Sequence, residues 1–224
     1  MPKESRRNPR LCGPISWSIH ATRRRCSLLP RRQHRVRGRI CTLNRASCHF
    51  LIYDDHTAQR QDLRILPLET SPDGERRPIP FLVTQADEWF AQFSPDGKWI
   101  AYTSDESGRR EVYVQGFAPD RIPAAAVGKW QISTAGGEKP RWRPDGTELY
   151  YLASDRKLMA VPVKIGPTFE PGVAVPLFET NVTGVIPYDV GTDGRFLINT
   201  ISEGGSPSAS PATVILNWQA GLKR

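Results

Sequence analysis

From residue 50 onward, short runs of apolar and aromatic residues alternate with turn residues, which is typical of a chain of antiparallel β-strands. Residues 50–53 form the first apolar run, residues 62–68 alternate apolar with polar positions, and residues 80–84 supply an outer strand. These runs predict a partial first sheet over residues 50 to about 86. The pattern indicates that its opening strand is missing.

The same scheme repeats along the rest of the chain. Strands are predicted at residues 89–94, 98–104, 111–117 and 129–133, then at 140–143, 148–153, 157–163 and 174–179, and finally at 188–190, 195–201 and 213–218. A short hairpin is expected at Asp155-Arg156, a longer loop between Gly166 and Gly172, and a flexible connection over residues 204–211.

A recurring phrase gives the period of the repeat. Phe-Ser-Pro-Asp-Gly at residues 93–97 is followed by Trp-Arg-Pro-Asp-Gly at 142–146 and Val-Gly-Thr-Asp-Gly at 190–194. The aspartates Asp96, Asp145 and Asp193 lie 49 and 48 residues apart (145 − 96 and 193 − 145). This period suits one four-stranded blade. The sequence therefore predicts an all-β fold, a partial β-propeller of about three and a half four-stranded antiparallel blades.

The residues of this phrase are expected to build turns. Glycine supplies the positive φ of a tight reversal, proline fixes φ on the approach, and aspartate accepts local N–H bonds. The predicted structural turn residues are Pro95, Asp96, Gly97, Pro144, Asp145, Gly146, Asp193 and Gly194. Each aspartate lacks a second carboxylate or a histidine at ligand spacing. We therefore predict no catalytic, cofactor-binding or metal-ligating residue and no cofactor.

Aromatic residues recur beside these turns. Large flat side chains are what packs between twisted sheets, so we expect inter-blade contacts from Phe93, Trp99, Trp142, Tyr150 and Phe196. By position, Trp99 is matched with Tyr150 and Phe196, and Phe93 with Trp142. Trp89 and Trp130 lie near loops and are candidates for lining a ligand surface.

The charge is concentrated in residues 1–49. This segment holds 13 of the 31 Lys and Arg residues, one acidic residue and all four cysteines, so the net charge of +8 combines +12 there with −4 in residues 50–224. No Cys-x-x-Cys pair supports a zinc site. We expect a basic leader that is disordered or results from reading a GC-rich region in the wrong frame. A nucleic-acid arm is the third and least favoured interpretation.

No apolar run in the chain has the length of a signal peptide or a membrane span. As written, the chain is expected to remain in the cytoplasm.

The ordered series of motifs in residues 50–224 resembles a known family. Residues 93–114, 128–142 and 158–163, with the ending Leu216-Asn217-Trp218, are similar to the TolB-type, WD-repeat-like propeller at the C-terminus of bacterial eukaryotic-like serine/threonine protein kinases. The resemblance implies a sensing or protein-binding region outside the cytoplasm, following a kinase domain and a membrane span. This chain has no Gly-rich phosphate loop, no His-Arg-Asp loop and no Asp-Phe-Gly motif, so we expect no kinase activity from it.

The favoured function is therefore a non-enzymatic β-propeller module, a truncated sensor region that binds a protein or a small ligand. The alternatives are an accessory propeller of a prolyl-oligopeptidase-type hydrolase, whose Gly-x-Ser-x-Gly elbow is absent here, and a TolB-like translocation protein. Nucleic-acid binding through the leader is the third. Because a propeller closes with roughly four to eight blades, we also expect a homo-oligomer or blades supplied in trans.

Overall fold

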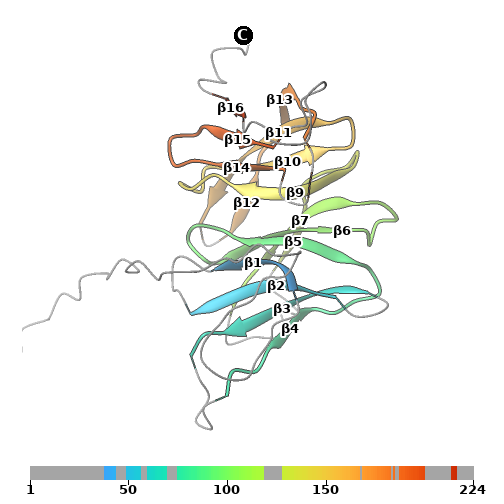
Figure 1. The fold of residues 1–224 in the computed structure, drawn as a ribbon, viewed down its shortest axis with the longest axis vertical. Helices are drawn as coiled ribbons and strands as arrows, with labels where there is room; N and C mark the ends of the chain where they lie inside the picture. The colour runs from blue at the N-terminus through green and yellow to red at the C-terminus, as the bar shows by residue number, and fades with distance from the viewer. Residues whose placement is uncertain are drawn as a thin grey trace, which may run out of the picture.

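The computed structural model describes residues 38–43, 49–56, 60–69, 75–118, 128–166, 168–182, 184, 187–199 and 213–215. Within these ranges the chain forms antiparallel sheets and no helix, which confirms the predicted all-β class. Four sheets follow one another in chain order along the long axis of the molecule (Figure 1). We refer to them as blades 1 to 4.

Blades 1 and 2 are four-stranded meanders. Blade 1 has the order β1 (Gly38–Leu43), β2 (Phe50–His56), β3 (Gln61–Pro67) and β4 (Ile79–Leu82). Blade 2 has the order β5 (Glu88–Phe93), β6 (Trp99–Ser104), β7 (Glu111–Gly116) and β8 (Lys129–Gln131).

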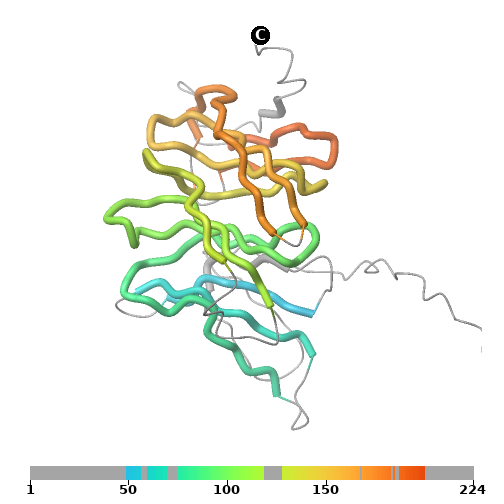
Figure 2. Tube along the Cα trace, turned by 180° about the vertical axis from the view of Figure 1, so that it is seen from behind, coloured from blue at the N-terminus to red at the C-terminus, as the bar shows by residue number. Residues whose placement is uncertain are grey.

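Blade 3 has five strands and the described part of blade 4 has three. Blade 3 contains β9 (Gly137–Trp142), β10 (Glu148–Ala153), β11 (Lys157–Ile165), β12 (Phe169–Pro171) and β13 (Val175–Glu179). Blade 4 contains β14 (Tyr188–Val190), β15 (Phe196–Ile198) and β16 (Thr213–Ile215). In each blade the first strand lies at one edge of the sheet and the next strands follow it in order, except that β12 and β13 of blade 3 both pair with β11 (Figures 1 and 2).

The Asp-Gly phrases lie at the turns between the first two strands of blades 2 to 4. Their glycines have positive φ, 73° at Gly97, 77° at Gly146 and 75° at Gly194. The side-chain oxygen Oδ1 of each aspartate accepts the N–H two residues ahead, at 3.2 Å for Asp96, 3.0 Å for Asp145 and 3.1 Å for Asp193. The sequence forms hairpins here because only glycine adopts this backbone without strain.

Blade 1 differs from the sequence expectation, because its opening strand is present. β1 lies inside the segment treated as a leader and pairs antiparallel with β2, with Gly38 opposite Asp55 and Leu43 opposite Leu51. The described strands therefore begin at Gly38 rather than Phe50. The arginines around this stretch masked its strand character, since Ile40-Cys-Thr-Leu43 is a short run of apolar and β-branched residues.

Blade 3 contains a second unexpected strand. The region between Gly166 and Gly172 was expected to be a loop, but β12 folds back on the end of β11, pairing Ile165 with Phe169 and Val163 with Pro171. This hairpin carries the Phe169 ring into the interface between blades 2 and 3, where it is 2% exposed. The glycines and prolines that flank the strand are what concealed it.

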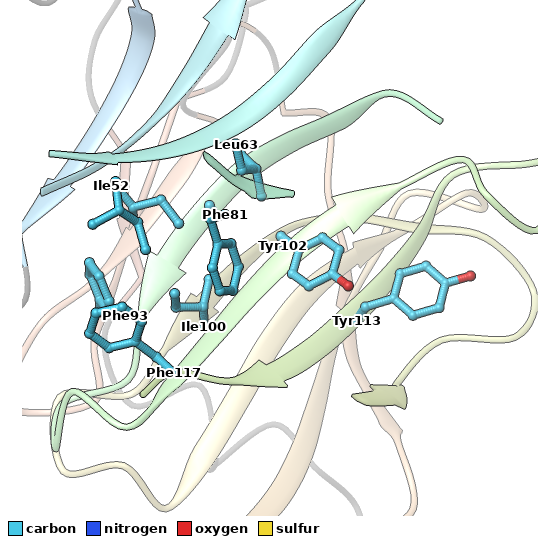
Figure 3. Packing of buried hydrophobic residues seen from close by; sticks show 10 residues of the cluster. Ile52, Leu63, Phe81, Phe93, Ile100, Tyr102, Tyr113 and Phe117 are labelled. Carbon is cyan, nitrogen blue, oxygen red and sulfur yellow. The ribbon is translucent and has the colours of Figure 1, made fainter. Parts of the chain in front are cut away.

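Each neighbouring pair of blades encloses its own core. The first cluster joins Ile52, Leu63 and Ile65 of blade 1 to Phe93 and Ile100 of blade 2, among others (Figure 3). The second cluster joins blades 2 and 3 and is rich in aromatic rings, and the third joins blades 3 and 4. The strands of blades 2 and 3 are therefore covered on both faces, as between the blades of a propeller.

The aromatic residues singled out in the sequence lie in these interfaces, and of the expected matches only that of Phe196 fails. Phe93 and Trp142 both face the preceding blade. Trp99 and Tyr150 each face the following blade, whereas Phe196 faces the preceding one and contacts Tyr150, with ring centroids 4.9 Å apart.

Turn length explains why Phe196 does not match Trp99. The N–H of Arg143 donates to the carbonyl of Glu148, but that of Gly191 donates to Arg195, so the turn in blade 4 is one residue shorter. Because side chains alternate along a strand, one residue fewer points Phe196 toward the preceding blade.

A substitution at Trp99 tests the packing between blades 2 and 3. Its ring lies 5.3 Å from Trp130 and 5.5 Å from Phe169, and the residue is 4% exposed. We expect Trp99→Ala to lower the free energy of unfolding by about 3–5 kcal/mol, measured by urea denaturation, because it leaves a cavity between two sheets. The control Leu197→Ala, at a half-exposed position, should cost less than about 1 kcal/mol. Equal losses in the two variants would contradict this packing.

Candidate binding surface at the inner ends of blades 2 and 3

A mixed aromatic and charged surface forms where the first strands of blades 2 and 3 begin. In a meander, the connections β6–β7 and β8–β9 lie at the opposite end of the sheet from the Asp-Gly turn between β5 and β6. We call this region the inner-end surface. It consists of Trp89, Phe90, Arg110, Glu138 and Lys139.

Two residues of this surface have an uncommon backbone conformation. Phe90 has φ 57° and Lys139 has φ 58°, in the left-handed region where residues other than glycine are rare. They lie 49 residues apart (139 − 90), on the first strands of consecutive blades. The ladder is irregular beside both, between Trp89 and Gln92 in β5 and opposite Tyr150 and Leu152 in β9. Each is therefore a β-bulge at an equivalent position of the repeat.

The preceding blade holds each bulge in place. The N–H of Phe90 donates to Oδ2 of Asp54 at 3.3 Å, and the N–H of Lys139 donates to Oγ1 of Thr103 at 3.1 Å. Asp54 and Thr103 are also 49 residues apart (103 − 54), each on the second strand of its blade. Backbone groups freed by the bulge are thus satisfied by a side chain from the neighbouring sheet.

The side chains of the surface form one connected row. The guanidinium carbon of Arg110 lies 4.6 Å from the Trp89 ring centroid, and its Nη1 is 3.2 Å from Oε2 of Glu138. The other oxygen of Glu138 lies 3.1 Å from Nζ of Lys139, which is 5.6 Å from the Phe90 ring centroid. Cation–π contacts of this kind stabilise by about 0.5–1 kcal/mol at exposed sites. The row alternates flat apolar groups with charges of both signs.

Beneath the row, Glu111 fixes the two connections that carry it. Its carboxylate is fully buried and accepts hydrogen bonds from Nε of Arg109 at 2.6 Å, from the N–H of Gly136 at 2.9 Å and from the hydroxyl of Ser133. Arg109 lies before β7, while Ser133 and Gly136 lie before β9. One carboxylate therefore joins the β6–β7 connection to the β8–β9 connection and positions Arg110 beside Glu138.

Glu88, next to Trp89, is a second buried carboxyl group at this end. It is 1% exposed, and Oε1 accepts a hydrogen bond from the hydroxyl of Thr84 at 2.6 Å. Oε2 has no hydrogen-bond partner. Burial raises the pKa of Glu88 to about 7, the negative charges of Asp62 and Glu106 act in the same direction, and the Thr84 hydrogen bond opposes them.

The structure places the predicted turn residues and inter-blade aromatic residues away from this surface. The Asp-Gly turns lie at the other end of the blades, and the predicted aromatic residues lie within the interfaces. Of the two ligand-surface candidates, Trp89 is only 7% exposed and lies against the guanidinium of Arg110, whereas Trp130 is half-buried in the interface, 5.3 Å from Trp99.

Sequence reasoning missed Phe90, Arg110 and Lys139. The 49-residue spacing of Phe90 and Lys139 was visible, but their positive φ was not, because neither residue type signals a bulge.

Two kinds of feature are absent from the described ranges. No group of three or more His, Cys, Asp or Glu side chains there is arranged to hold a metal ion. In the same ranges, no helix has the length and apolar character needed to cross a membrane.

Comparison with known proteins gives the fold. The sequence matches no protein-family model, and it matches no curated protein. Among solved structures, TolB from Acinetobacter baumannii is similar with a TM-score of 0.51 and 12% identity, over 73% of this chain and 37% of that chain. This likeness shows a β-propeller fold and nothing about activity.

Two other solved structures are also similar to this chain. The periplasmic gluconolactonase PpgL from Pseudomonas aeruginosa gives a TM-score of 0.49 at 14% identity, over 80% of this chain and 56% of that chain. The β-propeller domain of Cps50 (Swd1) from Myceliophteria thermophila gives 0.46 at 11%, over 70% and 51%. This chain spans between about a third and slightly more than half of the three structures named.

The buried Glu88 carboxyl group predicts a pH dependence of stability. Between pH 4.5 and about 7 the folded chain keeps a proton that the unfolded chain loses, so stability falls as pH rises through this window. The shift corresponds to a loss on the order of 3 kcal/mol, complete above pH 7. Glu88→Gln removes the charge. In urea denaturation at pH 8.5, the free energy of unfolding of this variant should therefore exceed that of the wild type by on the order of 1–3 kcal/mol.

Two controls accompany the comparison of Glu88→Gln with the wild type: a measurement at low pH and a variant at an exposed carboxylate. At pH 4 the Glu88→Gln variant and the wild type should be about equally stable, because Glu88 is then protonated in the folded chain. Glu179→Gln, at an exposed position, should leave the pH profile unchanged. An identical slope between pH 5 and 8 in the wild type and Glu88→Gln would show that Glu88 does not carry the effect.

Proposed function

We propose that this chain is a non-enzymatic β-propeller binding module whose contact region for a protein or small ligand is the inner-end surface. The observation that carries the proposal is the pair of bulges at Phe90 and Lys139, held by Asp54 and Thr103 of the preceding blades. The repeat fixes the same backbone twice and presents a different side chain each time.

The argument rests on the energetic cost of the left-handed backbone at Phe90 and Lys139. A non-glycine residue in the left-handed region costs roughly 1–3 kcal/mol, and bulges commonly re-aim side chains beside functional sites. Here the re-aimed side chains lie beside Arg110, an exposed residue of a type that dominates binding hot spots, whose guanidinium lies over the buried ring of Trp89. The half-buried ring of Phe90 offers apolar area, and the paired charges offer directional hydrogen bonds to a partner.

The finer assignment is a sensor region of a bacterial serine/threonine kinase. It is supported by the motif series in residues 93–163 and by the kinase-type ending at Trp218, both of which are sequence resemblances. The likeness to TolB agrees with the fold that this assignment requires. In this proposal the kinase activity belongs to another domain, and the propeller recognises the signal.

We also propose that the chain has no catalytic activity of its own. The support is the absence from the sequence of a Gly-x-Ser-x-Gly elbow and of the kinase motifs. At the inner-end surface, the carboxylate of Glu138 is paired with Arg110 and Lys139, an arrangement suited to recognition.

The test compares two charge-matched double variants of the full chain. Arg110→Gln with Lys139→Asn removes two positive charges from the surface, and asparagine tolerates the left-handed backbone at position 139. The control, Lys164→Gln with Arg195→Gln, removes two exposed positive charges elsewhere. Circular dichroism and thermal unfolding first establish that all three proteins are folded.

The immobilised proteins are incubated with an extract of the source cells, and each captured protein is then purified for affinity measurement. We expect the surface variant to bind at least tenfold more weakly than the wild type, because it loses two charged contacts at about 1.4 kcal/mol per tenfold. The control should bind like the wild type. Equal binding by the surface variant would refute the assignment of the surface. The binding function itself fails if the folded wild type captures nothing and shows no thermal shift in a small-ligand panel.

A further inference from the structure

Arg141, on the first strand of blade 3, is a buried cation without a counter-ion. The residue is 6% exposed, and its Nη1 donates a 2.8 Å hydrogen bond to the carbonyl of Pro140. Among the described residues no carboxylate forms an ion pair with it. Arginine is almost never buried unless it is paired, because removing its charge from water is costly.

The equivalent residue of blade 2 shows what this position does for the fold. Gln92 precedes Arg141 by 49 residues (141 − 92), and its Oε1 accepts the N–H of Trp142 at 2.8 Å. The side chain thus ties one first strand to the next. Arg141 cannot make this bond, because a guanidinium has donors and no acceptor. The corresponding N–H, that of Val190, instead donates to Oδ1 of Asp189 at 2.9 Å.

The groups around Arg141 are already engaged with other partners. Tyr150 is its cross-strand neighbour, and the Tyr150 hydroxyl donates to Oε2 of Glu148 at 2.6 Å. The same oxygen of Glu148 accepts from Nη1 of Arg143 at 2.9 Å. The Tyr188 hydroxyl of blade 4 donates to the carbonyl of Lys139. Because Lys139 and Arg141 are two residues apart on β9, this hydrogen bond brings Tyr188 to the part of the strand that carries Arg141.

The guanidinium of Arg141 has donors to spare although the residue is buried. Nε and Nη2 make no hydrogen bond to the described chain, and Nη1 reaches only the carbonyl of Pro140. A guanidinium in this state offers its fork of N–H donors to an incoming group.

We propose that Arg141 binds an oxyanion, the carboxylate or phosphate group of a ligand, between the first strands of blades 3 and 4. Arginine matches both groups with two parallel N–H···O bonds, and the enclosed setting strengthens the attraction. The site goes beyond the inner-end surface, since it requires neither Arg110 nor Trp89. The fold alone does not indicate the charge of a ligand, whereas this site predicts a negatively charged one.

The test measures thermal unfolding of the full chain in sodium phosphate and in sodium succinate, each against sodium chloride at equal ionic strength. In the wild type we expect a saturable rise of Tm in at least one of the two anions, because a ligand that binds only the folded state stabilises it. Arg141→Gln, which copies the residue of blade 2, should abolish the rise. Arg195→Gln, which removes an exposed arginine, should retain it.

The two anions distinguish a phosphate from a carboxylate ligand. The preferred group is the one whose anion saturates the rise of Tm at the lower concentration. Arg141→Lys keeps the charge and loses the fork, so its apparent affinity should fall about tenfold. That variant serves as the test if Arg141→Gln does not fold. The Arg110→Gln, Lys139→Asn variant should respond as the wild type does, which separates this site from the proposed binding surface. The proposal is overturned if neither anion raises the Tm of the wild type, or if the Arg141 variants respond as it does.

Discussion

The geometry of the molecule depends on hydrogen bonds that pass from one blade to the first strand of the next. Asp54 and Thr103 each accept a backbone N–H from the following blade, and Gln92 accepts the N–H of Trp142. A first strand has one sheet neighbour, so its free edge needs partners from outside its own sheet. The bulges at Phe90 and Lys139 take this form because the neighbouring blade supplies acceptors for their N–H groups.

The two interfaces around blade 3 meet the same packing demand with different chemistry. Between blades 2 and 3 the rings of Trp99, Trp142 and Phe169 pack at centroid distances of 5.5 Å and 6.1 Å. Between blades 3 and 4, Glu148 occupies the position that Trp99 has in blade 2, 49 residues earlier (148 − 99), and it is bound to Tyr150 and an arginine. Apolar burial dominates the first interface. The second combines an apolar cluster with the hydrogen bonds of the half-buried Glu148, because partly buried polar groups are costly when unpaired.

The sequence predicted the blade repeat and most strands because their signals are local. The Asp-Gly turn at Asp145 and Gly146 is specified by those two residues and lies where expected, and the strand Glu148–Ala153 has the predicted bounds. The first strand of blade 1 was missed because its evidence is pairing with β2, which lies outside its own residues. β12 was missed for the same reason.

The candidate surface was harder to foresee because it arises from contacts between distant residues. Trp89 was visible as an aromatic residue near a loop, but Arg110 meets it only once blade 2 has folded, and reaches Glu138 only after blades 2 and 3 stack. The position of Phe196 failed because one residue fewer in a turn reverses the face of a whole strand. Period counting finds the repeat, and it does not find a change of register within it.

The repeat also shows how one backbone position serves two purposes. Gln92 and Arg141 occupy equivalent places, and the first closes the gap to the next blade with an acceptor that the second lacks. Once Asp189 takes over the N–H of Val190, position 141 is released from its structural duty. A donor can then stand there at the cost of burying a charge, and such a cost persists where a ligand compensates it. Departure from the repeat is therefore the most informative feature of blade 3.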